Sequence, residues 1–230
     1  MSLLGDGAIA IWHDVPLEIR ADYYEWHNRE HQLERVAIPG FRRGRRYIAL
    51  AGEPDFFTLY ETDGPQVQSG ADYLLRLNNP TLWTRSVAPR LTQNIRSLCK
   101  VVVSLGPSQG GLLATLRYDV PEPRAEEQRR YLAHRVLPEL ADRPGIVGVH
   151  LCVADHAASM VQTEEKRNRP EAARVPGRIV LVEGAADRAS LDAACDDLLN
   201  DRVLLAAGAN TPIERGVYQL QNSRGKTAAG

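Results

Sequence analysis

The chain has 230 residues, of which 43% are hydrophobic, and carries 28 basic against 29 acidic side chains. This length allows one large domain, or two domains of about 110 residues, with a real hydrophobic core. A net charge of −1 draws the chain toward neither nucleic acid nor an anionic membrane, so we expect neither as a partner. Three cysteines without CxxC spacing indicate a reducing compartment, and the cytoplasm is the expected location. We predict no signal peptide and no membrane span.

The first half of the chain predicts strands and helices in the order βαββαβ. Apolar and aromatic side chains recur at helical spacing between Leu17 and Ala37, and Pro39-Gly40 stops that helix. Beyond it, β-compatible runs flank a helical pattern interrupted by prolines. The expected elements are a strand over 8–13, a helix over 17–37, strands over 45–50 and 55–62, a helical stretch over 71–97, and a strand over 100–105.

The second half repeats this plan. Pro144-Gly145 stops its first helix as Pro39-Gly40 does in the first half, which sets a period of about 105 residues. The joint is the glycine-rich GPSQGG. The expected elements are a strand over 112–120, a helix over 124–141, strands over 146–154 and 178–185, a helix over 188–205, and a strand over 217–221. We therefore predict one repeat over 1–105, a linker over 106–111 and a second repeat over 112–230.

The two repeats differ by a polar insertion over 155–177, between two strands of the second repeat. It is rich in charge and poor in aromatic residues. A long loop of this kind in a compact domain is a lid, a contact arm or a disordered segment.

Two βαββαβ units in tandem resemble a fused version of the dimeric α+β barrel superfamily, in which two antiparallel sheets face each other and helices cover the outside. The stretch WHNREHQLERVAIPGFRRGRRY, residues 26–47, is similar to the EthD-like group of that superfamily. The resemblance implies an α+β fold with two ferredoxin-like units packed sheet to sheet as a pseudo-dimeric barrel. The edge strands of each sheet would keep unpaired backbone groups, which is compatible with a homodimer.

That stretch places His27, Glu30 and His31 on adjacent turns of one helix. A histidine titrates near neutrality and can move a proton without a cofactor. The resemblance implies that His31 is the general base or acid, and we expect His27 to assist it. Glu30 lies in the apolar stripe of the helix and needs a partner there. Arg45 or Arg46 is the expected partner, either to tie the helix to the strand or to orient His31.

The second repeat lacks this trio, so we expect one site per chain. Its matching positions hold Leu132, Arg135 and Val136. Aromatic residues are also concentrated in the first half, where they form either a core or the wall of a cavity. The residues expected to contact a small-molecule ligand are Trp26, Tyr23, Arg46, Tyr60, Trp83 and His13.

A metal site and a haem site are alternatives to this interpretation. The spacing His27-x-x-Glu30-His31 matches the HxxEH signature of inverted zinc hydrolases. A catalytic zinc needs a third protein ligand, and no glutamate occurs between Glu61 and Glu122. Chlorite-dismutase-like proteins also fuse two such units and bind haem, but the available axial ligand here, His134, lies in a charged stretch. We therefore predict no metal and no cofactor.

These observations predict a cofactor-independent enzyme that acts by acid/base chemistry on a small apolar or aromatic, anionic compound. The reaction would be that of an isomerase, a lyase or a monooxygenase, and the resemblance implies degradation of organic compounds. A non-catalytic small-molecule-binding or accessory protein is the alternative, because the fold alone implies no function. A haem-binding protein and a metal-dependent HxxEH enzyme are the remaining alternatives.

Overall fold

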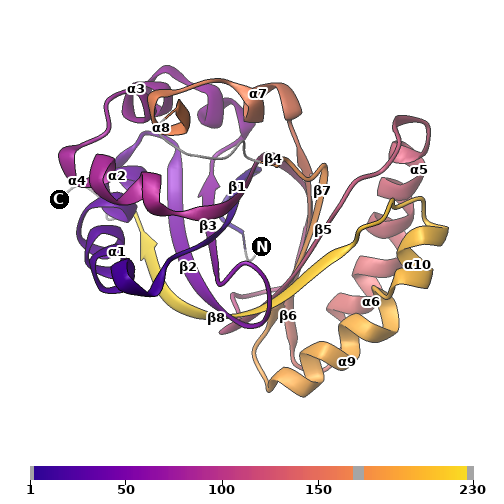
Figure 1. The fold of residues 1–230 in the computed structure, drawn as a ribbon. Coiled ribbons are helices and arrows are strands. Elements are labelled where there is room, and N and C mark those ends of the chain that lie inside the picture. Colours follow the sequence, from indigo (N-terminus) through magenta and orange to yellow (C-terminus); the bar gives the residue numbers. More distant parts are fainter. Residues whose placement is uncertain (1–2, 168–173, 227–230) are drawn as a thin grey trace.

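Strands of both repeats close into one barrel in the computed structural model, which describes residues 3–167 and 174–226 (Figure 1). Their order is β1-β3-β2-β8-β5-β7-β6-β4, and all neighbours in it are antiparallel. The strands are β1 (Gly7–Asp14), β2 (Phe41–Gly52), β3 (Phe56–Thr62), β4 (Thr92–Leu105), β5 (Leu112–Tyr118), β6 (Ile146–Ala154), β7 (Arg178–Gly184) and β8 (Glu214–Gly225). The predicted fold, two ferredoxin-like units fused into an antiparallel α+β barrel, is confirmed.

The barrel closes through two ladders between the repeats. The first repeat contributes β4-β1-β3-β2 and the second contributes β8-β5-β7-β6. Strand β2 then pairs with β8, and β4 pairs with β6. The expectation of unpaired edge strands is therefore wrong, because each of the described strands has a neighbour on both sides. The chain needs no second copy to complete its sheet.

The helices lie outside the barrel, in one group for each repeat (Figure 1). The first group comprises α1 (Arg20–Trp26), α2 (Gln32–Ala37), α3 (Ala71–Asn78) and α4 (Leu82–Val87). The second comprises α5 (Glu122–Tyr131), α6 (Leu137–Ala141), α9 (Arg188–Leu198) and α10 (Asp201–Ala206). Among the helices of the described residues, none is both long and apolar enough to cross a membrane.

Strand β4 is longer than predicted. A short 3-10 turn over Ala88–Arg90 follows α4, and pairing with β1 begins at Thr92. The prediction of helix over 92–97 is therefore wrong. Side chains of β4 are buried on both of its faces: Cys99 packs in the barrel interior, whereas Leu98 packs under the first-repeat helices. Burial on both faces removes the alternating pattern that would have indicated a strand.

Both repeats carry a π-helical turn at the same place in their first long helix. In the first repeat it spans His27–His31, between α1 and α2, and in the second it spans Leu132–Val136, between α5 and α6. The offset of 105 residues between these turns agrees with the predicted period. Such turns are frequent at functional sites. Since the second repeat keeps the turn with Leu132 and Val136 at the positions of His27 and His31, the turn itself belongs to the scaffold.

The insertion of the second repeat reaches across to the first. It forms α7 (His156–Met160) and α8 (Glu164–Arg167), which lie beside β4 and α3 (Figure 1). The backbone N–H of Leu98 donates to Ser159 Oγ over 2.9 Å, and that of Glu164 donates to Asn78 Oδ1 over 3.1 Å. The described parts of the insertion therefore form a contact arm, which we call the arm; residues 168–173 lie outside the described residues.

A buried charge network joins the repeats inside the barrel. Arg45 is fully buried, lies 2.9 Å from Glu61 of its own repeat, and donates two hydrogen bonds of 3.0 and 3.2 Å to Glu183 of the other. His150 Nε2 lies 3.2 Å from Glu183. Burial alone would raise the pKa of Glu183, but the His150 hydrogen bond and the charge of Arg45 outweigh it and lower that pKa to about 2.

Replacing Arg45 should therefore destabilise the barrel strongly. Arg45→Met leaves Glu61 and Glu183 buried near each other without the cation between them. Breaking a buried pair in this way costs about 3–5 kcal/mol, to be measured by urea unfolding at neutral pH. Arg42→Met is the control, because its exposed pair with Asp63 should contribute less than about 1 kcal/mol. Equal losses in the two variants would contradict a central role for the network.

Candidate functional site

A small cavity lies between the first-repeat helices and the outer face of the sheet. Alternate residues of β1 and β3 point outward toward it, whereas Trp12 and Phe57 pack in the barrel interior. The cavity has a volume of about 20 Å³, which is enough for about one water molecule. Its lining residues are Ile11, His13, Tyr23, Trp26, His27, His31, Thr58, Tyr60 and Leu91.

Three imidazoles converge on this cavity. His27 and His31 come from the π-helical turn, with ring centroids 5.6 Å apart, and the His31 ring lies 4.3 Å from that of Trp26. His13 arrives from the end of β1, and its Nε2 forms a 3.0 Å hydrogen bond with the Tyr23 hydroxyl. His27, His13 and His31 are 2%, 4% and 8% exposed. His31 is thus the most accessible of the three.

Burial sets the protonation states of the lining groups. Desolvation, together with the charges of Arg46, His13 and Arg35, lowers the pKa of His27 well below its ordinary value. Desolvation also raises the pKa of Tyr60, although Arg35 opposes that change. At neutral pH the cavity therefore presents a neutral imidazole beside a protonated phenol.

Two of these polar atoms have no hydrogen-bond partner among the described residues. They are Nδ1 of His27 and the hydroxyl of Tyr60, and both are buried. A buried polar atom without a partner costs free energy, and such atoms recur where a ligand or substrate supplies the missing bond. The cavity therefore offers one proton acceptor or donor on the helix and one hydroxyl donor on the sheet.

Glu30 does not join the histidines. Its carboxylate accepts hydrogen bonds from Thr81 Oγ1 over 2.6 Å and from Thr84 Oγ1 over 3.2 Å. Thr84 Oγ1 in turn accepts from Trp26 Nε1 over 3.1 Å. The predicted pairing of Glu30 with Arg45 or Arg46 is wrong, since Arg45 lies in the barrel interior. Glu30 orients the Trp26 wall through Thr84, and HxxEH does not form one cluster.

Two other predicted contacts lie away from the cavity wall. Arg46 covers the rings of Tyr23 and Tyr24, at 5.7 and 4.7 Å from their centroids, and donates to Asn28 Oδ1 over 2.8 Å. Arg46 therefore supports Tyr23, a residue of the cavity wall, from outside the cavity. Trp83 Nε1 donates to Asp22 at the surface over 3.0 Å. Within the described residues, no group of three or more histidine, cysteine or carboxylate side chains is arranged to hold a metal ion.

Sequence reasoning missed three lining residues: Ile11, Thr58 and Leu91. Strand alternation would have found the first two, because Ile11 shares a face with His13 and Thr58 shares one with Tyr60. Leu91 follows a 3-10 turn and carries no signal in the sequence.

The second repeat fills the equivalent space. Leu132 and Val136 replace His27 and His31 and belong to the apolar core of that repeat. At the positions of His13 and Tyr23, Tyr118 and Gln128 form a 2.7 Å hydrogen bond. The expectation that repeat two carries no equivalent ionisable trio agrees with this packing.

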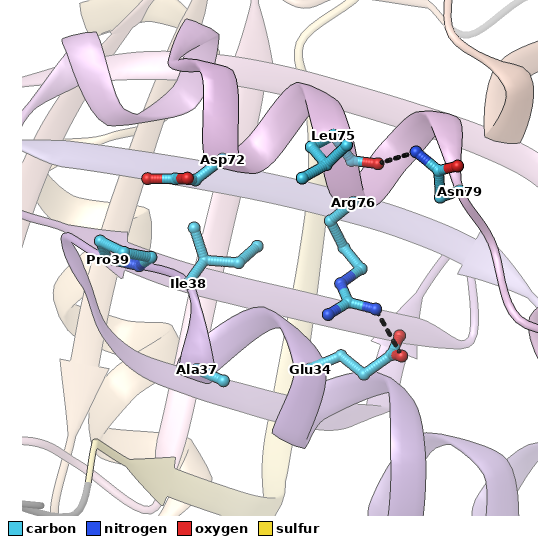
Figure 2. Close-up of a pocket in the computed structure, with 8 residues that line it drawn as sticks. All are labelled: Glu34, Ala37, Ile38, Pro39, Asp72, Leu75, Arg76 and Asn79. Atoms are coloured by element: carbon cyan, nitrogen blue, oxygen red, sulfur yellow. Dashed lines mark hydrogen bonds and ion pairs between the residues drawn. The ribbon is translucent and has the colours of Figure 1, made fainter.

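A larger groove on the outside of α2 and α3 has different chemistry (Figure 2). It has a volume of about 460 Å³ and is lined by residues including Ile38, Leu75 and Asp72. Arg76 pairs with Glu34 across it over 3.0 Å, and both side chains are partly exposed. The histidines do not line this groove, so we place the candidate site on the inner side of the helix.

The depressed pKa of His27 predicts a pH dependence of stability. At a pH below the ordinary histidine pKa of 6.5, the unfolded chain binds a proton at His27 that the folded chain does not. The free energy of unfolding therefore decreases as the pH is lowered. His27→Leu, which copies Leu132, should remove a dependence of about 1.4 kcal/mol per pH unit. Thermal unfolding of wild type and variant at pH 7.5 and 5.5 measures it. His134→Leu, at an exposed position of the second π-helical turn, is the control; equal pH slopes in wild type and His27→Leu would refute the buried neutral state.

Comparison with known proteins identifies the fold and no closer relationship. No protein-family model matches the chain, and no curated protein matches it. Among solved structures, an anthrone oxidase-like protein superposes with a TM-score of 0.64 at 12% identity, covering 97% of this chain and 95% of that one. A proposed monooxygenase from Lactobacillus acidophilus gives 0.57 at 10% identity, covering 97% and 98%. A proposed chlorite dismutase gives 0.54 at 12% identity, covering 95% and 96%. The chain therefore has the dimeric α+β barrel fold, with both ferredoxin-like units in a single polypeptide.

Proposed function

We propose that the chain is a cofactor-independent enzyme that removes a proton from an activated carbon or oxygen of a small aromatic compound. The observation that carries the proposal is the convergence of His27, His31 and the Tyr60 hydroxyl on one buried cavity of the first repeat. The EthD-like resemblance agrees with it. The similar solved structures support only the fold.

His31 acts as the general base, and His27 is its neutral neighbour. A base must be unprotonated and within reach of the substrate proton. His31 meets the second condition as the most exposed imidazole of the cavity, and burial keeps His27 neutral at physiological pH. The hydrogen bond between His13 and Tyr23 holds the far wall in place.

Tyr60 stabilises the anion that forms. Its raised pKa keeps the phenol protonated, so its hydroxyl can donate to a developing enolate or phenolate oxygen. Trp26 and Tyr23 supply the apolar wall, while Glu30 and Arg46 hold those rings in place from outside the cavity. Trp83, which is half-buried outside the cavity, has no role in this scheme.

A substrate with an acidic C–H bond is the direct test. Anthrone loses its ring-methylene proton to a base, and the resulting enolate reacts with O₂ to give anthraquinone and water. Wild-type protein should accelerate O₂ uptake and anthraquinone formation, and His31→Gln should reduce the rate by about 10²–10⁴-fold. His27→Gln should also reduce it, whereas His134→Gln should not.

The thermal stability of His31→Gln must stay close to that of wild type for this assignment. A large loss of stability would make the histidine structural. Wild type purified without a metal-affinity tag must also be tested for bound metal. If it contains stoichiometric zinc or iron, and His31→Gln loses that metal together with its rate, the reaction uses metal chemistry and not simple proton transfer. If wild type binds anthrone without turnover, the non-catalytic binding protein is the better description.

A further inference from the structure

Two buried arginines lie beside the cavity, on the side that the arm covers. Arg35 follows His31 by one helical turn in α2, and Arg96 pairs with Ile11, a lining residue, in the ladder between β4 and β1. They are 3% and 8% exposed. Arg96 donates to the Tyr73 hydroxyl over 2.8 Å. The charge of Arg35 also lowers the pKa of two lining groups, His27 and Tyr60, so it acts electrostatically on the cavity.

Positive charge exceeds negative charge in this cluster. The carboxylate paired with Arg35 is Glu165, and Arg96 has no carboxylate partner among the described residues. Arg35 Nη1 is buried without an acceptor in the same described part of the chain, and the buried amide of Asn94 likewise has no partner there. Burying a charge without a counterion is costly. Among the described residues the cluster therefore keeps a buried donor on Arg35 and a charge on Arg96 that a bound anion would satisfy.

Glu165 belongs to the arm of the second repeat, not to the scaffold of the first. It is 7% exposed and enters the cluster from α8, which is anchored by the hydrogen bond from Glu164 N to Asn78. Its carboxylate accepts a hydrogen bond from Nη2 of Arg35, whereas Nη1 has no acceptor among the described residues. Guanidinium groups bind carboxylates through two parallel hydrogen bonds, a geometry that a substrate can reproduce.

We propose that Arg35 and Arg96 bind the carboxylate of an aromatic carboxylate substrate, and that Glu165 holds the Arg35 position until the substrate displaces it. This inference rests on the proposed function, because the same cavity receives the aromatic ring. A space of about 20 Å³ does not accommodate an aromatic ring, so groups at its border must move when substrate enters. Departure of Glu165, whose charge acts on the lining residue Tyr60, would also free a cation for the substrate.

Paired probes that differ only in charge test this assignment. Isothermal titration with 2-naphthoate and 2-naphthamide measures what the carboxylate contributes to affinity. Wild type should bind 2-naphthoate at least about tenfold more tightly than 2-naphthamide. Arg96→Gln should remove most of that preference. Glu165→Gln should tighten 2-naphthoate by about tenfold, since the competing carboxylate is gone, and should leave 2-naphthamide unchanged.

Arg35→Gln alone would leave Glu165 buried without its cation and is open to misfolding. The double variant Arg35→Gln/Glu165→Gln keeps a neutral hydrogen-bonded pair and should fold, as checked by circular dichroism, while losing the carboxylate preference. Arg76→Gln/Glu34→Gln is the matched control, because it neutralises the exposed pair of the outer groove (Figure 2). That control should bind both probes like wild type.

The outcomes separate this inference from the proposed function. Equal affinity of wild type for the two probes, or no binding of either at millimolar concentration, overturns the inference. The anthrone assay of His31 still tests the proposed function in either case. A carboxylate preference that survives in both the double variant and Arg96→Gln also overturns it. A preference lost in those variants, but retained in the control, assigns the carboxylate site.

Discussion

Barrel closure within one chain is the constraint on which the rest of this structure depends. The ladders between β2 and β8 and between β4 and β6 replace the contact that separate subunits would make. Inside, Arg45 lies between a glutamate of each repeat, so that one cation contacts both Glu61 and Glu183. This network and a core that includes Trp12, Tyr47 and Phe57 lie in the barrel interior. The candidate site uses the outer face of the sheet, under the helices.

The two repeats show how one scaffold separates stability from chemistry. Both have the π-helical turn, the sheet and a polar contact between the first strand and the first helix: His13 with Tyr23 in one, Tyr118 with Gln128 in the other. In the second repeat, leucine and valine fill the space above the sheet and stabilise the core. In the first, imidazoles occupy the same positions and leave a small polar cavity. Replacing apolar packing with a polar cavity lowers the stability of the fold, and in a chain with two repeats only one of them carries that loss.

The arm brings a residue of the second repeat close to the candidate site of the first. It crosses to β4 and α3 and places Glu165 against Arg35. Arg35 lies one helical turn beyond His31 and acts electrostatically on His27 and Tyr60. Arg35 and Glu165, which pair between the repeats, thus both act on the pKa of Tyr60, although burial has the larger effect. The described residues that line the cavity come from the first repeat, and the arm places one carboxylate of the second repeat against Arg35.

Local pattern determined the repeat period, the order of strands and helices, and the helix that carries His27 and His31. These features depend on neighbours within a few residues, on the Pro-Gly stops and on apolar spacing, so a single sequence contains them. Which groups meet across the fold was decided by tertiary structure. Helical projection placed Glu30 in the apolar stripe and required a partner, but strand register turned Arg45 into the barrel, and the partners became Thr81 and Thr84. Long-range register and burial from both sides, as in β4, leave no periodic trace in the chain, because they depend on segments that lie far apart in sequence.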